Sequence, residues 1–486
     1  MSAARASLTK GSAFMTGSRV VSIGVGYLLN VYLARTLGPA GFGLFAVVIT
    51  ILVWLELVVA EGLPLWVVRS AGDAREGGRL PRSYVLVQLG VSLALAALLV
   101  AVAPLLARVF AQPADAALRY ATGLFRVSAV DIPLFGLYNL FLAVLLGSGA
   151  YGLQATSTSG YAIVKLVATV ALVQAGLSVL GAVLGSIVGS LFGLLLVLAL
   201  IALRLRGVRL FGEETHRRRE AVAGSVVPAA LLILQTLALS ADMWIVKATL
   251  PPADAGFYRA ASLIAQVPIA LSGGLVWALY SAYSEAHRRG DAERLRHYAS
   301  QTVRLLVAGG ALAVALVAPT ARALLVTVYS VRYAAGGPLL ATLVAGTGVG
   351  VVALALAPTL IIEGRGRPLL AGAFVLVGAE VAAAVALAPR VGPLGAAVPV
   401  ATAFALAALL ILGAVRRRLA FPLASALVRL LVPAAVVAAV ALAVRPAPGL
   451  GLLAWYAALS AGYAVLLVVS RGLTAADLAA VREGLR

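Results

Sequence analysis

Ionisable side chains interrupt several long apolar stretches of this sequence, and they are the residues best placed to do chemistry. The basic members are Lys165, Arg126, Arg19, Lys247 and Arg259. A charge in hydrocarbon is costly, so such side chains normally face protein or water. Lys165, in the stretch GYAIVKLVATV, is the deepest. Ammonium and guanidinium groups in a wet cavity would bind an anion, and the alternative is that they snorkel to lipid headgroups or form structural pairs.

The acidic members of this set are Asp131, Asp242, Glu56 and Glu380. Asp131 follows Arg126 by five residues, and Asp242 precedes Lys247 by five. Side chains that share a helix face are three or four residues apart, so neither pair can form within one helix. The partners of these acids are therefore expected on other helices. Such an acid would either bind a coupling proton or sodium ion, or neutralise a neighbouring cation; we favour neutralisation.

The composition indicates the kind of protein that must hold these charges. Of 486 residues, 62% are hydrophobic and 12% are charged, and the mean hydropathy is +1.05. Apolar runs near or above the roughly 20 residues that cross a bilayer recur along the chain, which predicts a helical membrane protein. The chain has no cysteine, and its histidines, His216, His287 and His297, lie in polar segments. We therefore expect no disulfide, no metal site and no cofactor.

The apolar runs predict fourteen transmembrane helices, the last two of which follow two sets of six. They are predicted at about 14–34, 44–68, 84–107, 122–146, 157–175, 179–203, 223–249, 257–283, 302–328, 337–362, 369–388, 394–415, 427–444 and 451–470. The longest loop on the outer side, about 108–121, is too short for a folded catalytic site. An enzyme is therefore not expected.

The basic residues outside these runs give the direction of the helices, because Lys and Arg accumulate in short cytoplasmic loops. With the amino terminus inside, most of them fall in cytoplasmic segments. The outer segments hold only Arg35, Arg108, Arg119, Arg332, Arg390 and Arg445. This asymmetry predicts a multi-pass protein with both termini in the cytoplasm. The net charge of +20 is then a topology signal, and because it is split among short loops, nucleic-acid binding is not expected.

Two turns in the sequence indicate a duplication. TLGPAGFGLF at 36–45 aligns without a gap on TLPPADAGFY at 249–258, and each following helix leads to a basic segment with the tripeptide GDA, at 72–74 and 290–292. Pro and Gly suit the turn in both copies. Six helices separate the copies, so both halves should have the same orientation, as in transporters built from parallel repeats.

The predicted fold is therefore an all-α polytopic membrane protein made of two parallel-orientation six-helix bundles and two C-terminal helices. The predicted domains are residues 1–210, residues 211–418, and residues 419–486 with a cytoplasmic tail. Two bundles that meet at a pseudo-twofold axis along the membrane normal would leave a central cleft able to open to either side. This is an architecture for transport by alternating access.

Short motifs carry a resemblance to a known family. RTLGPAGFG at 35–43, Gly62 with Arg69 at the end of the second helix, GFY at 256–258 and EGRGRP at 363–368 resemble the polysaccharide flippases (Wzx-like) of the multidrug/oligosaccharidyl-lipid/polysaccharide exporter superfamily. The resemblance covers most of the chain in pattern and topology. It implies translocation of an undecaprenyl-diphosphate-linked oligosaccharide across the cytoplasmic membrane for surface polysaccharide assembly.

The resemblance also implies the partners. These are the lipid-linked oligosaccharide, membrane lipids and a polysaccharide polymerase acting after export. A coupling proton or sodium ion is a further partner if one of the intramembrane acids binds it. The five intramembrane cations would then line a cleft for the diphosphate. Alternative hypotheses are an exporter of drugs or small amphiphiles from the same superfamily, a lipid II type flippase, and a membrane polysaccharide polymerase, for which a large outer loop is lacking.

Overall fold

The computed structural model describes residues 2–61, 64, 79–111, 114–204, 209–212, 230–416 and 423–472. The chain divides into two compact units, Met1–Gly224 and Ser225–Arg486. Several predicted features lie outside the described residues: Gly62, Arg69, the GDA tripeptide at 72–74, the start of the predicted helix at 223–249 and the tail after residue 472. The predicted division at about residues 210 and 418 stays a prediction.

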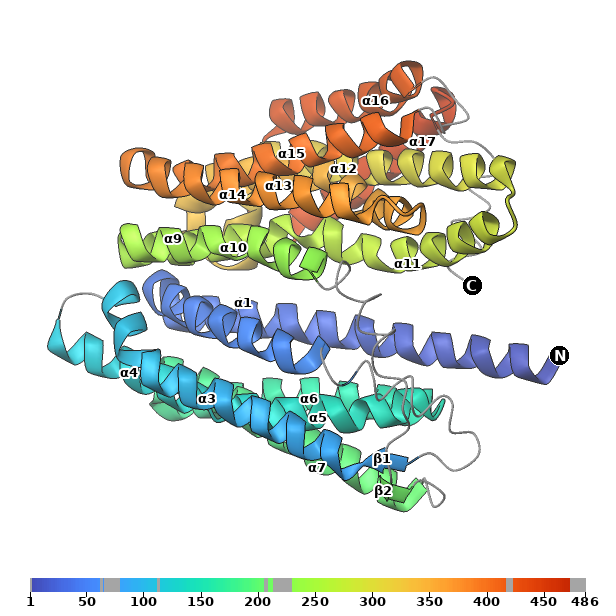
Figure 1. Cartoon of the computed structure of the whole chain (residues 1–486). Coiled ribbons are helices and arrows are strands. Elements are labelled where there is room, and N and C mark those ends of the chain that lie inside the picture. Colours follow the sequence, from blue (N-terminus) through green and yellow to red (C-terminus); the bar gives the residue numbers. More distant parts are fainter. Residues whose placement is uncertain are drawn as a thin grey trace. The chain divides into compact units, whose positions relative to one another are not determined.

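The described part of unit 1, residues 1–224, consists of packed helices and one pair of short strands (Figure 1). Its described elements are α1 (Ser2–Glu61), β1 (Arg79–Pro81), α3 (Arg82–Phe110), α4 (Asp115–Ser128), α5 (Asp131–Gly147), α6 (Tyr151–Leu172), the π-helical turn η1 (Val173–Leu177), α7 (Ser178–Arg204) and β2 (Arg209–Gly212). Because α3 runs to Phe110 and α4 begins at Asp115, helix covers most of the predicted loop at 108–121.

Unit 2, residues 225–486, contains only helical elements in its described part (Figure 1). After a helix at 230–238 come α9 (Ala241–Thr249), α10 (Pro252–Ala265), α11 (Val267–Arg288), α12 (Ala292–Val328), the 3-10 turn η2 (Val331–Gly336), α13 (Gly337–Ile362), α14 (Gly366–Val391), α15 (Leu394–Val415), α16 (Leu423–Val444) and α17 (Gly451–Val469). Helix α12 begins ten residues before the predicted start at 302.

The two turns that suggested a duplication break the helices at equivalent positions. In α1 the backbone leaves the helical region at Gly38 (φ 66°, ψ 176°), and the ribbon forms two arms that run back along each other (Figure 1). In unit 2 the break between α9 and α10 falls at Pro251 (φ −52°, ψ 147°), which aligns with Gly38. The positive φ explains the glycine in unit 1, whereas proline suits the break in unit 2.

Short strands β1 and β2 form a feature that the sequence reading missed. They pair in parallel, with Arg79 opposite Arg209, and both lie in stretches predicted as cytoplasmic loops. The described chain is all-α, as predicted, apart from this one short strand pair. The pairing brings the end of the 69–82 segment next to the start of the 204–219 segment, as expected of two loops on the same side of a membrane.

Three helices are interrupted inside stretches that were predicted to be continuous. The predicted helix at 122–146 consists of α4 and α5, with a break at residues 129–130, and the one at 257–283 consists of α10 and α11, with a break at Gln266. Pro133 and Pro268 follow these two breaks, and proline cannot donate the helical hydrogen bond to the residue four positions earlier. A third break, at residues 239–240, precedes α9.

Glycines spaced four apart on α7 pack against α6, as the sequence stretch GAVLGSIVGSLFG predicts. A Cβ on Gly185 would lie 2.6 Å from Thr169 Cα, and one on Gly189 would lie 2.7 Å from Lys165 Cβ. Gly181 and Gly193 are in similarly close contact with Leu172 and with Tyr138 and Tyr161. Packing through these glycines is thus confirmed, and it sets the distance between the two helices.

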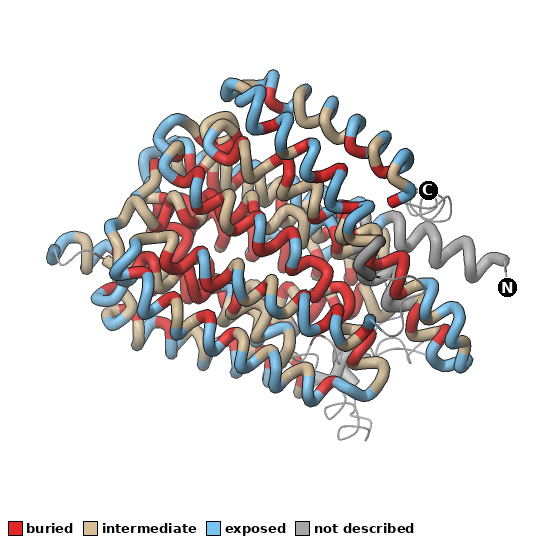
Figure 2. Tube along the Cα trace, turned by 90° about the horizontal axis from the view of Figure 1, so that it is seen from above, coloured by how far each residue is buried: buried red, intermediate tan, exposed pale blue. Residues whose placement is uncertain are grey.

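Apolar side chains cover much of the outer surface of both units. Exposed examples are Val20 at 65%, Leu195 at 58% and Phe374 at 68%, and exposed positions alternate with buried ones around most helices (Figure 2). Eleven helices of the described residues are long and apolar enough to cross a membrane. Two of these spans, Gly17–Ala60 and Tyr151–Leu203, each contain two predicted crossings. The chain is a multi-pass membrane protein, and fourteen crossings stays a prediction.

Helices α16 and α17, from the predicted domain at 419–486, pack on α12 and form one hydrophobic core with it inside unit 2. Ala308, Ala315, Leu430 and Val437 are among the buried residues of this contact. The hydroxyl of Tyr463 on α17 donates to the carbonyl of Ala308 at 3.0 Å.

Candidate functional site

Asp131 lies at the first residue of α5, where that helix begins inside a membrane span. Its side chain is 1% exposed. A helix amino terminus carries partial positive charge and unpaired backbone N–H groups, so it stabilises a carboxylate. The break at residues 129–130 therefore provides a buried place that tolerates a negative charge.

Lys165 projects from the middle of α6 and is only partly exposed. Its ammonium donates to the hydroxyl of Tyr161 at 3.4 Å and lies 5.6 Å from the centre of that ring. The two residues are one turn apart on the same helix face. Because Gly189 of α7 packs directly against the stem of Lys165, the position of the side chain depends on the glycine contact between α6 and α7.

Two carboxylates from other helices balance Lys165. Glu56, on the second arm of α1, is 9% exposed, and the ammonium interacts electrostatically with both Asp131 and Glu56. Neither acid forms a direct ion pair with Lys165 in the described part of the chain. The partners of Asp131 thus lie on other helices, as the spacing predicts.

The hydroxyl of Ser190 on α7 lies beside the Asp131 carboxylate. Neither Ser190 Oγ nor Asp131 Oδ1 has a hydrogen bond of standard geometry to another described residue. We call Glu56, Asp131, Tyr161, Lys165 and Ser190 the Lys165 cluster. With both acids and the lysine ionised, its two carboxylates and one ammonium leave one negative charge.

A second group of charges lies in unit 2, around Asp242. This residue is in the first turn of α9, next to the break at 239–240, and is 3% exposed. The Tyr258 hydroxyl donates to Asp242 Oδ2 at 2.5 Å, and the backbone N–H of Met243 donates to Oδ1 at 2.7 Å. Tyr258 belongs to the repeated turn, where its counterpart in unit 1 is Phe45.

Two further charged residues complete this group. Arg259 on α10 and Glu380 on α14 both interact electrostatically with Asp242. Glu380 is 4% exposed, and its Oε1 atom has no hydrogen-bond partner among the described residues. We call Asp242, Tyr258, Arg259 and Glu380 the Asp242 cluster. It holds two buried carboxylates and one guanidinium.

The other three predicted site residues lie apart from these contacts. Arg19 on α1 and Arg126 in the last turn of α4 are exposed, whereas Lys247 in the last turn of α9 is 8% exposed. No hydrogen bond or ion pair joins any of them to another described residue. Arg126 was predicted near the start of a helix, but α4 begins at Asp115, eleven residues earlier.

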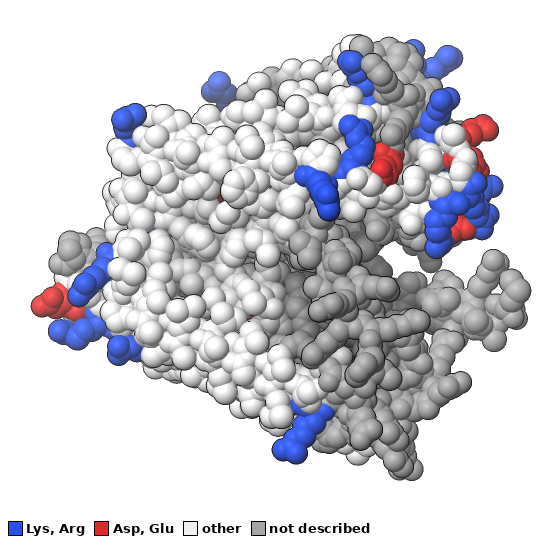
Figure 3. All heavy atoms as spheres, viewed as in Figure 1, with Lys and Arg blue, Asp and Glu red and all other residues white. Residues whose placement is uncertain are grey.

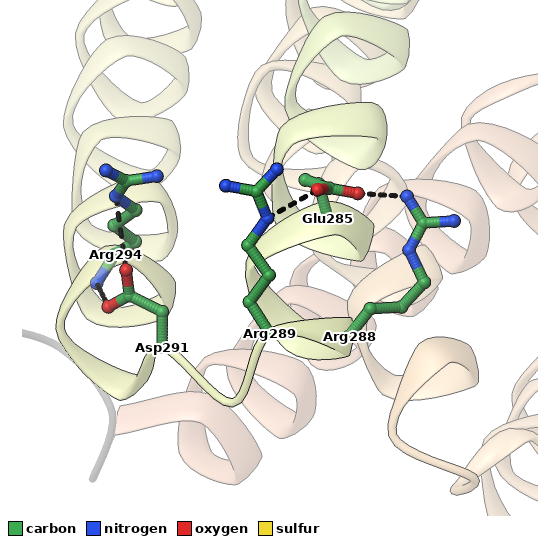
Figure 4. Close-up of polar contacts among 5 residues, drawn as sticks. All are labelled: Glu285, Arg288, Arg289, Asp291 and Arg294. Carbon is green, nitrogen blue, oxygen red and sulfur yellow. Dashed lines mark hydrogen bonds and ion pairs between the residues drawn. The ribbon is translucent and has the colours of Figure 1, made fainter.

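Exposed ion pairs occur at the turn between α11 and α12, in a predicted cytoplasmic segment (Figure 4). Glu285 accepts from Arg288 and, at 2.6 Å, from Arg289, while Asp291 accepts from Arg294 at 3.1 Å. Hydrogen bonds from Arg288 and Arg289 hold the pKa of Glu285 below its usual value. On the face drawn in Figure 3, charged side chains of unit 2 gather mainly near helix ends.

Sequence reasoning missed three residues of these clusters, and two of them gave a signal. Tyr161 precedes Lys165 by four residues, which places both on one helix face, and Tyr258 ends the repeated turn. Ser190 gave none, because one serine in a glycine-rich stretch indicates only packing.

The model of the protein family described as polysaccharide biosynthesis protein matches residues 8–286. No curated protein sequence matches the chain.

Solved structures match the fold over most of its length. A lipid II flippase MurJ, in an inward closed conformation, has a TM-score of 0.73 at 13% identity and covers 97% of this chain and 99% of its own. An inward-facing multidrug resistance MATE family transporter of the MOP superfamily has a TM-score of 0.63 at 17% identity, with 82% and 98% covered. A MOP superfamily transporter from Pyrococcus furiosus has 0.62 at 17% identity, with 84% and 95% covered. At these identities the likeness establishes the fold alone.

Proposed function

Because the chain belongs to the polysaccharide biosynthesis protein family, we propose that it is a flippase for an undecaprenyl-diphosphate-linked oligosaccharide. It moves this substrate across the cytoplasmic membrane by alternating access, for assembly of a surface polysaccharide such as O-antigen, exopolysaccharide or capsule. The amino and carboxyl termini lie in the cytoplasm. A polysaccharide polymerase uses the exported unit.

The observation that carries this proposal is the family match over residues 8–286, and a full-length likeness in fold to a lipid flippase supports it. The lipid II flippase structure covers 97% of this chain, whereas the MATE family transporter and the Pyrococcus furiosus MOP superfamily transporter cover 82% and 84%. The family match supports a role in polysaccharide synthesis, and the likeness supports a substrate that carries a lipid. A drug exporter of the same superfamily accounts less well for the family match and for the likeness to a lipid flippase.

The anionic part of the substrate is bound by the cations of the membrane segments. Lys165 is the leading candidate, because it lies in mid-helix, is partly exposed and has its stem held against α7. Arg126, Arg19, Lys247 and Arg259 are further candidates for the same diphosphate. Ammonium and guanidinium groups replace the hydrogen bonds that a diphosphate loses when it leaves water.

The acids divide into two roles under this proposal. Glu56 and Asp131 neutralise Lys165 while the site is empty. Asp242 and Glu380 interact with each other and lie in unit 2, where Arg259 interacts with Asp242. This leaves room for a coupling proton or sodium ion, which Asp242 and Glu380 bind.

Reconstitution tests the proposal. Purified protein is reconstituted into liposomes whose inner leaflet carries a lipid-linked oligosaccharide. A glycosidase added outside then cleaves the sugar that reaches the outer leaflet, and the amount released measures translocation. We expect protein-dependent translocation that Lys165→Ala abolishes, while the exposed Glu285→Gln control stays active. Parallel liposomes with lipid II and with a cationic dye test the two related activities. Translocation of only the dye would contradict the proposal.

A lipid II type flippase remains the second candidate, because the structure with a TM-score of 0.73 is a lipid II flippase. Both substrates carry a lipid diphosphate, so the cation site does not separate them. The lipid II arm of the experiment does.

A further inference from the structure

The Lys165 cluster holds more negative than positive charge in a buried place. Asp131 is 1% exposed and Glu56 is 9% exposed, and they also interact with each other. Two carboxylates in one low-dielectric site cannot both stay ionised without a nearby cation. The state of this pair therefore depends on where the Lys165 ammonium is.

The groups around the pair can be named helix by helix. Lys165 and Tyr161 come from α6, and Ser190 comes from α7. From α3, the neutral Gln88 side chain donates to the carbonyl of Gly136 on α5 at 3.2 Å. Lys165 is the one cation that interacts with both acids within the described residues. No second positive charge there could replace it.

Lys165 is also the most accessible charged member of the cluster. Both acids are buried, whereas the lysine is partly exposed and forms no direct ion pair with either acid. An anion that arrives at its exposed side would compete with the acids for the same ammonium. The unpartnered oxygen of Asp131, Oδ1, is available to carry a proton.

We propose that Lys165 is a shared cation: when an anionic headgroup binds the ammonium, the Glu56–Asp131 pair takes up one proton from water. The proton forms an O–H bond on one carboxylate oxygen, and Lys165 stays an ammonium throughout. When the anion leaves, the ammonium again neutralises both acids and the proton returns to water. This inference rests on the proposed function, because it takes a lipid diphosphate as the anion.

Proton uptake at this pair solves an electrostatic problem of the proposed substrate. A diphosphate beside two carboxylates would be repelled, and one bound proton reduces the negative charge of the loaded site. Binding should therefore tighten as the pH falls. In a variant without the two carboxylates, the affinity for the diphosphate should lose most of this pH dependence. At alkaline pH it should exceed the wild-type affinity by about tenfold, the scale of one hydrogen bond to a charged group.

Calorimetry tests this linkage on the purified full-length protein with undecaprenyl diphosphate as the probe. Binding heats in two sodium-free buffers of different ionisation enthalpy give the number of protons taken up. The matched comparison is Glu56→Gln/Asp131→Asn, which keeps Lys165. We expect wild type to take up about one proton more than this double variant, since the linkage equals the difference in bound protons between states. The probe's own protonation is common to both proteins and cancels.

A second measurement covers the case in which the double variant does not fold. Infrared difference spectra of wild type should gain the band of a protonated carboxylic acid when the probe is added, and Asp131→Asn or Glu56→Gln should shift or remove it. Binding with equal proton uptake in wild type and variant, or with no carboxylic acid band, would overturn this inference and leave the proposed function intact. Failure of wild type to bind the probe would overturn both.

Discussion

The Lys165 cluster and the Asp242 cluster place the same kind of group in the same local structure, yet balance it differently. Asp131 and Asp242 each lie in the first turn of a helix that begins at a break inside a membrane span. In unit 1 the balancing group is a lysine on another helix, without a direct ion pair. In unit 2 it is the Tyr258 hydroxyl at 2.5 Å, with Arg259 nearby.

The two carboxylates differ in how their oxygens are held. The Asp242 carboxylate accepts hydrogen bonds on both oxygens, so its position is fixed by its neighbours. The Asp131 carboxylate has an unpartnered oxygen, and its cation is partly exposed. Under the proposed function, the anion-binding lysine lies in unit 1 and the acids that bind the coupling ion lie in unit 2.

Removing Lys165 should have the largest effect. Lys165→Ala takes away the ammonium proposed to bind the diphosphate, and a hydrogen bond to a charged group contributes about 1.5–3 kcal/mol. Translocation should fall by about 100-fold, since each 1.4 kcal/mol is a factor of ten, while the protein still inserts. Rates per amount of inserted protein check this. Full activity of the variant would remove Lys165 from the site.

Removing the tyrosine hydroxyl in unit 2 should have a smaller effect. Tyr258→Phe makes this position resemble Phe45 and takes away the hydrogen bond to Asp242. We expect a loss of about 1.5–3 kcal/mol of stability, the usual scale for a hydrogen bond to a charged group. Denaturation in detergent measures it. The reverse change, Phe45→Tyr, adds a buried hydroxyl without an acid beside it, so stabilisation by that variant would contradict the comparison.

Crowding Lys165 from α7 tests whether its position depends on the glycine contact. Gly189→Ala places a Cβ 2.7 Å from Lys165 Cβ and should cost about 1–3 kcal/mol by overpacking, with weaker binding of the diphosphate probe. Gly152→Ala is the matched control, because a Cβ there meets nothing within 4 Å. Equal stability and equal probe binding of the two variants would mean that the α6–α7 contact is looser than described.

The smallest effect is expected for the exposed ion pairs. Because the folded pKa of Glu285 is lowered, its contribution is present above the pKa of the unfolded chain and is lost as the pH falls through the folded value. Both arginine partners are well exposed, at 72% and 64%, and exposed pairs contribute little. Glu285→Gln should leave translocation unchanged and reduce any acid-linked change in stability. A clear loss of transport would give this turn a role in the mechanism.

Much of the helical framework could be predicted from the sequence, because apolar runs and Pro/Gly turns record the local chemistry directly. The turn at Gly38 and the packing of Gly185 and Gly189 are examples. The break before Asp131 was missed, although Pro133 indicates it, because the apolar run continues across it. The strand pair β1–β2 could not be predicted, since it joins two loops far apart in sequence.

The site was predictable in part. Ionisable residues in apolar runs identified both clusters, and the five-residue spacings showed that their partners lie on other helices. Which helix supplies each partner depends on tertiary packing, so the sequence left the match of Lys165 with Glu56 and Asp131 open. The roles of Arg19, Arg126 and Lys247 stay predictions.

The most direct test of the account compares two headgroups in one translocation assay. Liposomes receive the same oligosaccharide on undecaprenyl diphosphate or on an uncharged polyprenyl ether, and sugar accessibility is followed for wild type and Lys165→Ala. The account predicts that wild type moves the diphosphate form far faster and that Lys165→Ala removes this preference. Equal rates for the charged and uncharged forms in wild type would contradict it.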